Sequence, residues 1–151
     1  MDLSMLDVAY HDADATALID EVQQEYVARY GGRDETPVAD GEFAPPGGAF
    51  VVLRVDGTPV GCGGLRRHDD DVVEIKRMYI RRAHRRRGHG RRLLGALEER
   101  ARMLGYGRAV LETGTAQPEA VAMYTGAGYT AIPPYGIHRC SPRSRCFGKD
   151  L

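Results

Sequence analysis

The chain has 151 residues, enough for one domain with a hydrophobic core and too few for two domains of ordinary size. Hydrophobic residues make up 42% of the sequence and charged residues 28%, which is typical of a soluble globular protein. The 21 Lys and Arg residues balance the 21 Asp and Glu residues, and this zero net charge excludes a uniformly basic nucleic-acid coat protein.

Hydrophobic periodicity and turn residues predict one mixed α/β domain. Asp12 or Asp14 is placed to cap a first helix, and Asp56–Gly57 between two β-branched runs is typical of a hairpin turn. In chain order we expect a strand at 6–9, a helix ending near 30, a loop at 31–48, a hairpin at 49–67, a strand at 72–80, a helix ending at Gly105, a strand at 108–113, a helix at 117–128, and strands at 129–132 and 145–151. This order predicts a mixed sheet flanked by helices.

The cysteines and the N-terminus favour a reduced, cytoplasmic setting. Cys62, Cys140 and Cys146 are odd in number and include no C-x-x-C pair. The first residues are acidic and lack a long apolar run, so we expect no secretory signal, and no window has the roughly 18 apolar residues of a membrane span. His68 beside Asp69–Asp71 resembles a metal cluster only in composition, because adjacent turn residues rarely converge on one ion; we expect no metal.

An arginine–glycine segment, RRRGHGRRLL at residues 85–94, lies between a predicted strand and a predicted helix. Glycines allow a tight bend, the first helical turn offers unpaired N–H groups, and arginines bind phosphate in pairs. The segment therefore predicts a pyrophosphate site. A Walker loop needs G-K-[ST], which is absent, and a Rossmann fingerprint needs a glycine where Leu93 stands.

The same residues carry a family resemblance. Arg85–Gly90 matches R-x-x-G-x-G and resembles the acetyl-CoA pyrophosphate loop of the GNAT superfamily of N-acetyltransferases. EIKRMYIRRAHRRRGHG resembles the family's fourth strand and loop, and LETGTAQPEAVAMYTGAGY resembles its next strand and helix. The predicted element order matches the family order, so the resemblance covers nearly all of residues 1–151 as a single GNAT-like domain. It implies a mostly antiparallel central sheet with a splayed pair of parallel strands.

The resemblance implies acetyl-CoA as co-substrate. The pantetheine arm would pair with the backbone of β-strand residues 78–80, the pyrophosphate would bind amides of residues 86–91, and the thioester would lie near Met78 and Leu111–Glu112. Gln117 stands where the family often has an asparagine that contacts pantetheine, and Arg82 stands where a proline is common. The expected cofactor-binding residues are Met78, Tyr79, Ile80, Arg85, Arg86, Arg87, Gly88, His89, Gly90, Arg91, Gln117 and Tyr124.

The resemblance also implies direct attack of a primary amine on the thioester in a ternary complex. Tyr124 matches the family tyrosine whose hydroxyl protonates the departing thiolate. A backbone N–H near Tyr79 would stabilise the oxyanion. Glu74, on the strand that approaches the thioester, is the first candidate for the base, acting through water. The alternatives are that Tyr124 only packs in its helix and that Glu74 only pairs with Lys76 or an arginine.

The acceptor is expected to contact the loop Gly31–Gly48, the hairpin near Gly63–His68 and the loop Pro133–Ser144, since loops differ most within a fold. A first set of charges would attract a cationic amine: Asp34, Glu35, Asp40 and Glu42. A second set would attract an acceptor that bears a carboxylate, such as an amino acid: Arg139, Arg143 and Arg145. The sequence leaves both classes open. His138 lies in the late loop, where it could meet the acceptor.

Two other functions are compatible with the sequence. One is a non-catalytic module that binds acyl-CoA, although Glu74 and Tyr124 are both present. The other is a nucleic-acid-binding domain that uses the Arg81–Arg92 tract, but the only Phe, Tyr or Trp beside that tract is Tyr79. We expect neither nucleic acid nor a membrane as partner, and the resemblance implies a homodimer.

Overall fold

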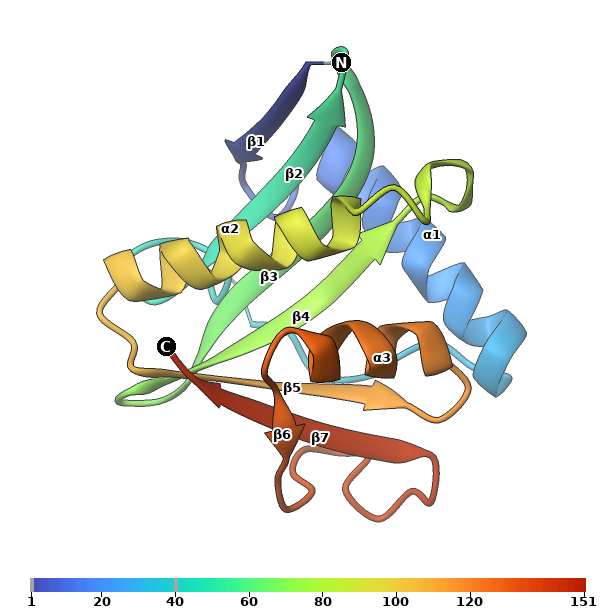
Figure 1. Ribbon diagram of the computed structural model, residues 1–151, viewed down its shortest axis with the longest axis vertical. Helices are drawn as coiled ribbons and strands as arrows, with labels where there is room; N and C mark the ends of the chain where they lie inside the picture. The colour runs from blue at the N-terminus through green and yellow to red at the C-terminus, as the bar shows by residue number, and fades with distance from the viewer. Residues whose placement is uncertain (1, 40) are drawn as a thin grey trace.

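The computed structural model describes residues 2–39 and 41–151, in which seven strands form one sheet of order β1-β2-β3-β4-β5-β7-β6 (Figure 1). In chain order the elements are β1 (Leu3–Asp7), α1 (Ala13–Tyr30), β2 (Ala49–Val55), β3 (Thr58–Asp69), β4 (Val72–Ile80), a 3₁₀ turn (Arg82–His84), α2 (His89–Met103), β5 (Arg108–Gly114), α3 (Pro118–Gly126), β6 (Thr130–Ala131) and β7 (Ser144–Asp150). The predicted order of elements is confirmed.

The sheet contains one parallel pair, and that pair diverges. Strands β4 and β5 run parallel from Val72, opposite Arg108, to Ile75, opposite Leu111, whereas the other neighbouring strands of the described sheet are antiparallel. Strand β4 continues to Ile80 beyond the last paired residue. The predicted mixed sheet with a splayed parallel pair is therefore confirmed, and the divergence opens the interior of the sheet between β4 and β5.

Helices cover both faces of the sheet: α1 lies on one face, and α2 and α3 lie on the other (Figure 1). Because side chains alternate along a strand, β2 contributes to two cores. Val51 packs in the cluster that holds Leu93, Leu94 and Leu97 of α2. Its neighbours Phe50 and Val52 pack in the cluster that holds Ala15 and Leu18 of α1.

Local signals explain where α1 and the first hairpin begin and end. The Asp12 carboxylate accepts hydrogen bonds from the amides of Asp14 and Ala15 at 3.0 and 3.2 Å, which satisfies two free N–H groups of the first turn. Gly31 ends the helix with a positive φ of 81°. Asp56 and Gly57 both adopt positive φ, 50° and 82°, as a tight hairpin turn requires.

Two short strands differ from their predicted bounds. Strand β1 covers Leu3–Asp7 rather than residues 6–9, because its limits are set by antiparallel pairing with β2, from Leu3 opposite Val55 to Asp7 opposite Val51. Strand β6 is reduced to Thr130–Ala131, because Tyr129 before it turns into the core and donates to Glu98 at 2.8 Å. None of the helices in the described ranges has the length and apolarity needed to cross a bilayer.

Candidate active site

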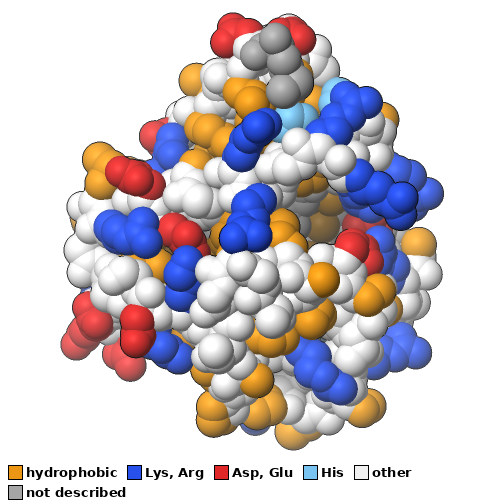
Figure 2. Space-filling model, viewed as in Figure 1, with side chains coloured by type: hydrophobic (Ala, Val, Ile, Leu, Met, Phe, Trp, Pro, Cys, Tyr) orange, Lys and Arg blue, Asp and Glu red, His pale blue; other side chains and the backbone are white. Residues whose placement is uncertain are grey.

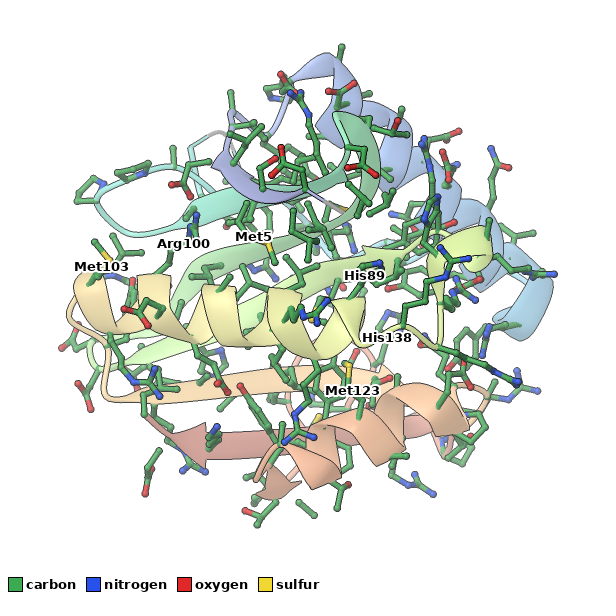
Figure 3. All side chains as sticks on the ribbon, turned by 45° about the horizontal axis from the view of Figure 1, so that its top comes forward. Met5, His89, Arg100, Met103, Met123 and His138 are labelled. Carbon is green, nitrogen blue, oxygen red and sulfur yellow. The ribbon has the colours of Figure 1, made fainter. Side chains whose placement is uncertain are left out.

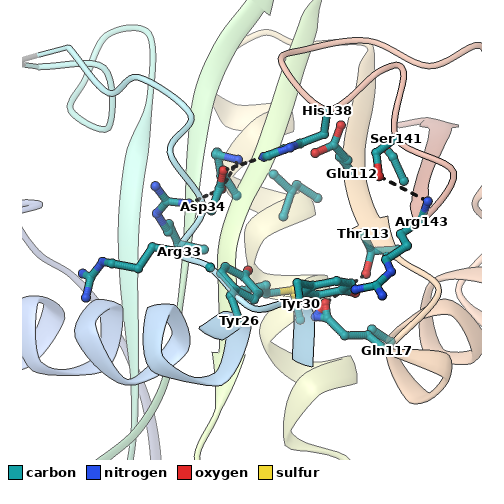
Figure 4. A pocket seen from close by; sticks show the side chains of 18 of the residues that line it. Tyr26, Tyr30, Arg33, Asp34, Glu112, Thr113, Gln117, His138, Ser141 and Arg143 are labelled. Atoms are coloured by element: carbon teal, nitrogen blue, oxygen red, sulfur yellow. Dashed lines mark hydrogen bonds and ion pairs between the residues drawn. The ribbon is translucent and has the colours of Figure 1, made fainter. Parts of the chain in front are cut away.

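The divergence of β4 and β5 forms the wall of a cavity of about 430 Å³ (Figure 4). Its lining comes from α1, β4, β5, α3 and two loops, the loop after α1 and the loop before β7. Lining residues are Tyr26, Tyr30, Gly32, Arg33, Asp34, Ile75, Lys76, Arg77, Met78, Glu112, Thr113, Gly114, Gln117, Ala120, Tyr124, His138, Ser141, Arg143 and Ser144. The volume lies in the range of small-molecule sites.

A β-bulge shapes the β4 wall of this cavity. Lys76 pairs with Gly64 and Tyr79 pairs with Cys62, so Arg77 and Met78 together face one residue of β3, Gly63. Arg77 adopts a positive φ of 59°. A Cβ on Gly63 would stand 2.7 Å from a Leu97 methyl group and 3.2 Å from Met78 Cγ, so only glycine fits there. The bulge therefore disrupts the ladder just beyond Ile75, where pairing with β5 ends.

Tyr124 projects from α3 into this region. Its ring is buried and packs edge-on against Tyr129, with 5.8 Å between the centroids, while its Oη lies 3.6 Å from Met78 Sδ. Burial raises the pKa of Tyr124, so the phenol holds its proton and is a donor at neutral pH. The structure thus brings Tyr124 together with Met78. Gln117, just before α3, also lines the cavity.

The arginine–glycine segment passes from β4 into the first turn of α2. Within the described chain, none of the amides of residues 86–91 donates to a backbone carbonyl or a side chain. Positive φ values at Arg86 and Gly88, 63° and 80°, curve this backbone, and a Cβ on Gly88 would meet open space. A concave run of free N–H groups at a helix N-terminus favours an anion.

Side chains around this turn are unevenly exposed. Figure 2 shows Lys and Arg side chains gathered on the right of this face, where Figure 1 places the segment between β4 and α2, with a hollow beside them. His89 is 1% exposed, and neither ring nitrogen has a partner in the described chain. Burial, together with nearby arginines, lowers the pKa of His89. A Cβ on Gly90 would stand 2.9 Å from the sulfur of Met123, which points from α3 toward this turn (Figure 3).

Arg85, which is predicted near the phosphate, and Arg81 of the same tract instead connect the segment to α1. Arg81 forms an ion pair with Glu21 at 2.6 Å. Arg85 donates to the Ile80 carbonyl and to Glu25, each at 2.7 Å. Their guanidinium groups thus hold the segment in place, whereas Arg86 and Arg87 are exposed and form no ion pair with any described residue.

The two carboxylates near the thioester region have different surroundings. Glu74 is 6% exposed, and its carboxylate accepts hydrogen bonds from Arg66 Nε at 2.7 Å and Tyr135 Oη at 3.1 Å. It lines a smaller cavity of about 160 Å³, together with His68 of the predicted hairpin, and it does not line the main cavity. The structure therefore does not bring Glu74 into the cavity that holds Tyr124.

Glu112 does line the main cavity and also the smaller one. It stands on β5 one residue beyond Leu111, the last residue paired with β4. Burial raises the pKa of Glu112, against the opposing charge of His138. The sequence indicates Glu112 only as a neighbour of the thioester. Its position relative to the divergence depends on strand register, which the sequence does not give.

Asp34 joins three segments at the cavity wall. Its carboxylate contacts Lys76 at 2.8 Å, Arg77 at 2.6 Å, His138 at 3.1 Å and the Thr36 hydroxyl at 2.6 Å. Burial opposes ionisation, but Lys76 and Thr36 hold the pKa of Asp34 well below its usual range. Asp34 therefore stays ionised and fixes the loop after α1 against β4 and the loop before β7 (Figure 4).

Among the described residues, no group of three or more His, Cys, Asp or Glu side chains is arranged to hold a metal ion.

Comparison with known proteins gives a consistent result. A family model described as the acetyltransferase (GNAT) family matches residues 15–129. An IAA acetyltransferase of Azospirillum brasilense is 36% identical over 110 residues, which are 72% of this chain and 72% of that protein. An uncharacterized N-acetyltransferase of Escherichia coli, YjgM, is 34% identical over 93 residues, 60% of this chain and 56% of that protein.

Solved structures share the fold over the whole chain. A Klebsiella pneumoniae protein described as an acyl-CoA N-acyltransferase has 30% identity and a TM-score of 0.82, with 99% of this chain and 97% of that chain covered. A GNAT family acetyltransferase from Elizabethkingia anophelis, solved with acetyl-CoA bound, has 14% identity and a TM-score of 0.71, with 99% and 98% covered.

Proposed function

The chain belongs to the acetyltransferase (GNAT) family and is an acyltransferase, and on that premise we propose that it moves an acetyl group from acetyl-CoA to a primary amine by direct attack in a ternary complex. One observation carries the proposal. The cavity at the divergence of β4 and β5 holds a protonated phenol, Tyr124, and a carboxylate of raised pKa, Glu112, in one chamber. Such a pair suits a reaction that removes one proton and delivers another.

The chain offers acetyl-CoA a matching set of groups. The pyrophosphate would bind the free amides of residues 86–91, and the pantetheine arm would follow the edge of β4 that β5 leaves unpaired, at residues 78–80. Gln117 would face the arm from the start of α3. The acetyl-CoA bound to the Elizabethkingia anophelis protein of the same fold supports this assignment.

The chemistry then follows from where the groups lie. The amine nitrogen bonds to the acetyl carbon, the carbonyl oxygen takes the electron pair as an oxyanion, and the carbon–sulfur bond then breaks as the carbonyl re-forms. The amine proton passes to Glu112, directly or through water, and the Tyr124 hydroxyl protonates the departing thiolate. A backbone N–H of β4 near Tyr79 would stabilise the oxyanion. Positioning of the two reactants in one cavity supplies the rest of the acceleration.

We place the base at Glu112 rather than at Glu74. The Glu74 carboxylate is already bound by Arg66 and Tyr135 and faces the smaller cavity. Glu112 forms no ion pair with any described residue, and its raised pKa makes it a better proton acceptor near neutral pH. The prediction for Glu74 stays a prediction, and it is tested below against Glu112.

Calorimetric titration with acetyl-CoA, free CoA and a short DNA duplex tests the cofactor assignment. We expect micromolar binding of acetyl-CoA that Gly88→Glu weakens about a hundredfold or more, because the new carboxylate opposes phosphate at the helix N-terminus. Gly95→Glu makes the same change two turns along α2, at an exposed position with open space around it, and should leave binding intact.

Activity is measured as acetyl-CoA-dependent thiol release across a panel of primary amines. Turnover that requires both Glu112 and Tyr124 supports the enzyme. Acetyl-CoA binding without turnover on any amine would favour the non-catalytic acyl-CoA module. Absence of CoA binding, with salt-sensitive duplex binding, would instead assign the arginine tract to nucleic acid.

A further inference from the structure

Two of the four acidic residues predicted to attract a cationic acceptor, Asp34 and Glu42, are already paired with cations of the chain. Asp34 contacts Lys76, Arg77 and His138. Glu42 pairs with Arg66 at 2.7 Å, and Glu35 lines neither cavity. Asp40 lies outside the described residues. Asp34, the one described member of the acidic set that lines the main cavity, therefore has little charge left for a cationic acceptor.

The three arginines of the late loop differ from one another. Arg139 donates to the Gly136 carbonyl at 3.1 Å, and Arg145 donates to the carbonyls of Pro142 and Ser144 at 3.0 and 2.8 Å. Neither of them lines the cavity. Arg143 does line it, and in Figure 4 its side chain extends from the loop toward Tyr30 and Gln117. Burial raises the pKa of the Tyr30 phenol, and the positive charge of Arg143 partly opposes that rise.

Arg143 is also unlike the other cations of the cavity wall. Lys76 and Arg77 pair with Asp34, and Arg33 pairs with Asp20 at 3.5 Å. Within residues 2–39 and 41–151, no carboxylate forms an ion pair with Arg143. Its backbone is nevertheless fixed, because its N–H donates to Ser141 Oγ at 3.2 Å and its carbonyl accepts from the Thr115 amide at 2.8 Å. The loop before β7 thus holds, at the wall of the main cavity, a guanidinium that has no carboxylate partner among the described residues.

We propose that the acceptor is an amine that also bears a carboxylate, as an amino acid does, and that Arg143 binds this carboxylate while Glu112 meets the amine. The proposal rests on the acetyl transfer proposed above and adds the acceptor class to it. Guanidinium groups bind carboxylates through paired, charge-assisted hydrogen bonds.

The register of β5 and β7 is compatible with this arrangement. Glu112 stands opposite Cys146, and the Arg143 carbonyl contacts Thr115. Thr115 follows Glu112 by three positions, which is about 10 Å along extended backbone. The Arg143 side chain is long enough to span most of this distance toward Glu112. The remaining gap is short, as is the separation between the amine and the carboxylate of an amino acid.

The test compares the proteinogenic L-amino acids with their carboxamides as acceptors in the thiol-release assay. For the amino acid that is acetylated best, we expect kcat/KM to exceed that of its carboxamide about tenfold or more. Arg143→Gln should remove most of this preference and leave the KM for acetyl-CoA unchanged. Arg143→Glu should invert it. For each variant, kcat/KM for the amino acid is divided by kcat/KM for its carboxamide. Because the two amines differ in basicity by the same amount in every variant, comparing these ratios between variants cancels that difference.

Arg139→Gln and Arg145→Gln are the matched controls, because each removes one arginine from the same loop without touching the cavity. Both should keep the wild-type ratio. Turnover of amines with no carboxylate preference, or a preference that survives Arg143→Gln, overturns the acceptor class and leaves the proposed transfer standing. A rise in the KM for acetyl-CoA alone in Arg143→Gln would assign Arg143 to the cofactor and also overturn it. Absence of turnover with every amine overturns the transfer itself.

Discussion

The proposed cofactor side and the proposed acceptor side of the site would bind their ligands by different means. On the cofactor side, free amides of one continuous segment, residues 86–91, face outward from the start of α2. On the acceptor side, side chains from three distant segments meet: Asp34 after α1, Glu112 on β5 and Arg143 before β7. Binding by the backbone depends on local conformation and leaves a motif of fixed spacing. Binding by side chains depends on topology and on which charges neutralise one another.

The largest effect should separate Glu112 from Glu74. Glu112→Gln removes the proposed base without a large change of shape, and we expect kcat to fall about 10²- to 10⁴-fold with acetyl-CoA affinity kept. In the wild type, kcat should rise with pH through an apparent pKa above the ordinary 4.5, because burial raises the pKa of Glu112 and the base acts when deprotonated. Steady-state kinetics as a function of pH measures both effects.

Glu74→Gln is the counterpart of that change. It leaves Arg66, whose side chain is 13% exposed, without its buried partner, so stability should fall while kcat stays within a fewfold of wild type. The reverse result, a large loss of kcat in Glu74→Gln and little loss in Glu112→Gln, would return the base to the position that the sequence predicts.

The next largest effect concerns the carboxylate that joins the acceptor loops. Asp34→Asn leaves Arg77 and Lys76 buried without a counter-charge, and we expect the free energy of unfolding to fall by about 3 kcal/mol. Because the folded-state pKa of Asp34 is lowered, its contribution is present above its ordinary value of 3.8 and is lost as pH falls below it. The variant should therefore lose part of the acid dependence of unfolding below that pH, measured by urea titration.

Asp20→Asn is the control for Asp34. Asp20 pairs with Arg33 at 3.5 Å, and both side chains are 54% exposed, so the change should cost about 1 kcal/mol or less. Equal losses in the two variants would mean that the Asp34 cluster does not hold the acceptor side together.

A smaller effect tests Tyr124, the proposed proton donor, which lies between the proposed cofactor side and the proposed acceptor side. Tyr124→Phe removes only the hydroxyl, whose recorded contact is Met78 Sδ at 3.6 Å, so the fold should persist. We expect kcat to fall about 10- to 100-fold, because no group then protonates the departing CoA thiolate. Tyr129→Phe removes a buried hydroxyl that donates to Glu98 at 2.8 Å, and it should lower stability with little change in kcat. Similar kinetics for the two variants would make Tyr124 a packing residue.

The comparison of the two sides also explains what the sequence predicts well. Helical spacing places Leu93, Leu94 and Leu97 on one face, and the structure buries them as expected. The glycine bend and the helix start are local features, so their position after β4 is predictable from neighbouring residues. The contact of Tyr124 with Met78, which lies 46 residues earlier in the chain, depends instead on the fold.

Other features depend on partners that are remote in sequence. Arg81 and Arg85 belong to the arginine tract, yet their partners Glu21 and Glu25 lie in α1, 60 residues earlier. Glu74 and Glu112 are the same residue type, and their surroundings differ because Arg66 and Tyr135 donate hydrogen bonds to Glu74 and not to Glu112. Likewise, the choice among three loop arginines depends on which of them faces the cavity. None of these relations has a signal within a short window of sequence.

The smallest effect should distinguish two glycines of the cofactor side. Gly88 adopts a φ of 80° before α2, whereas Gly95 lies within the helix with open space around its Cα. Gly95→Ala should raise the free energy of unfolding by about 0.5–1 kcal/mol, because alanine loses less backbone entropy in a helix. Gly88→Ala should lower it by about 1 kcal/mol, because a Cβ is strained in the left-handed region. Urea unfolding measures both. If the two changes in the free energy of unfolding have the same sign, the bend before α2 does not depend on glycine at position 88. The proposal that this bend shapes the anion site formed by the amides of residues 86–91 would then be wrong.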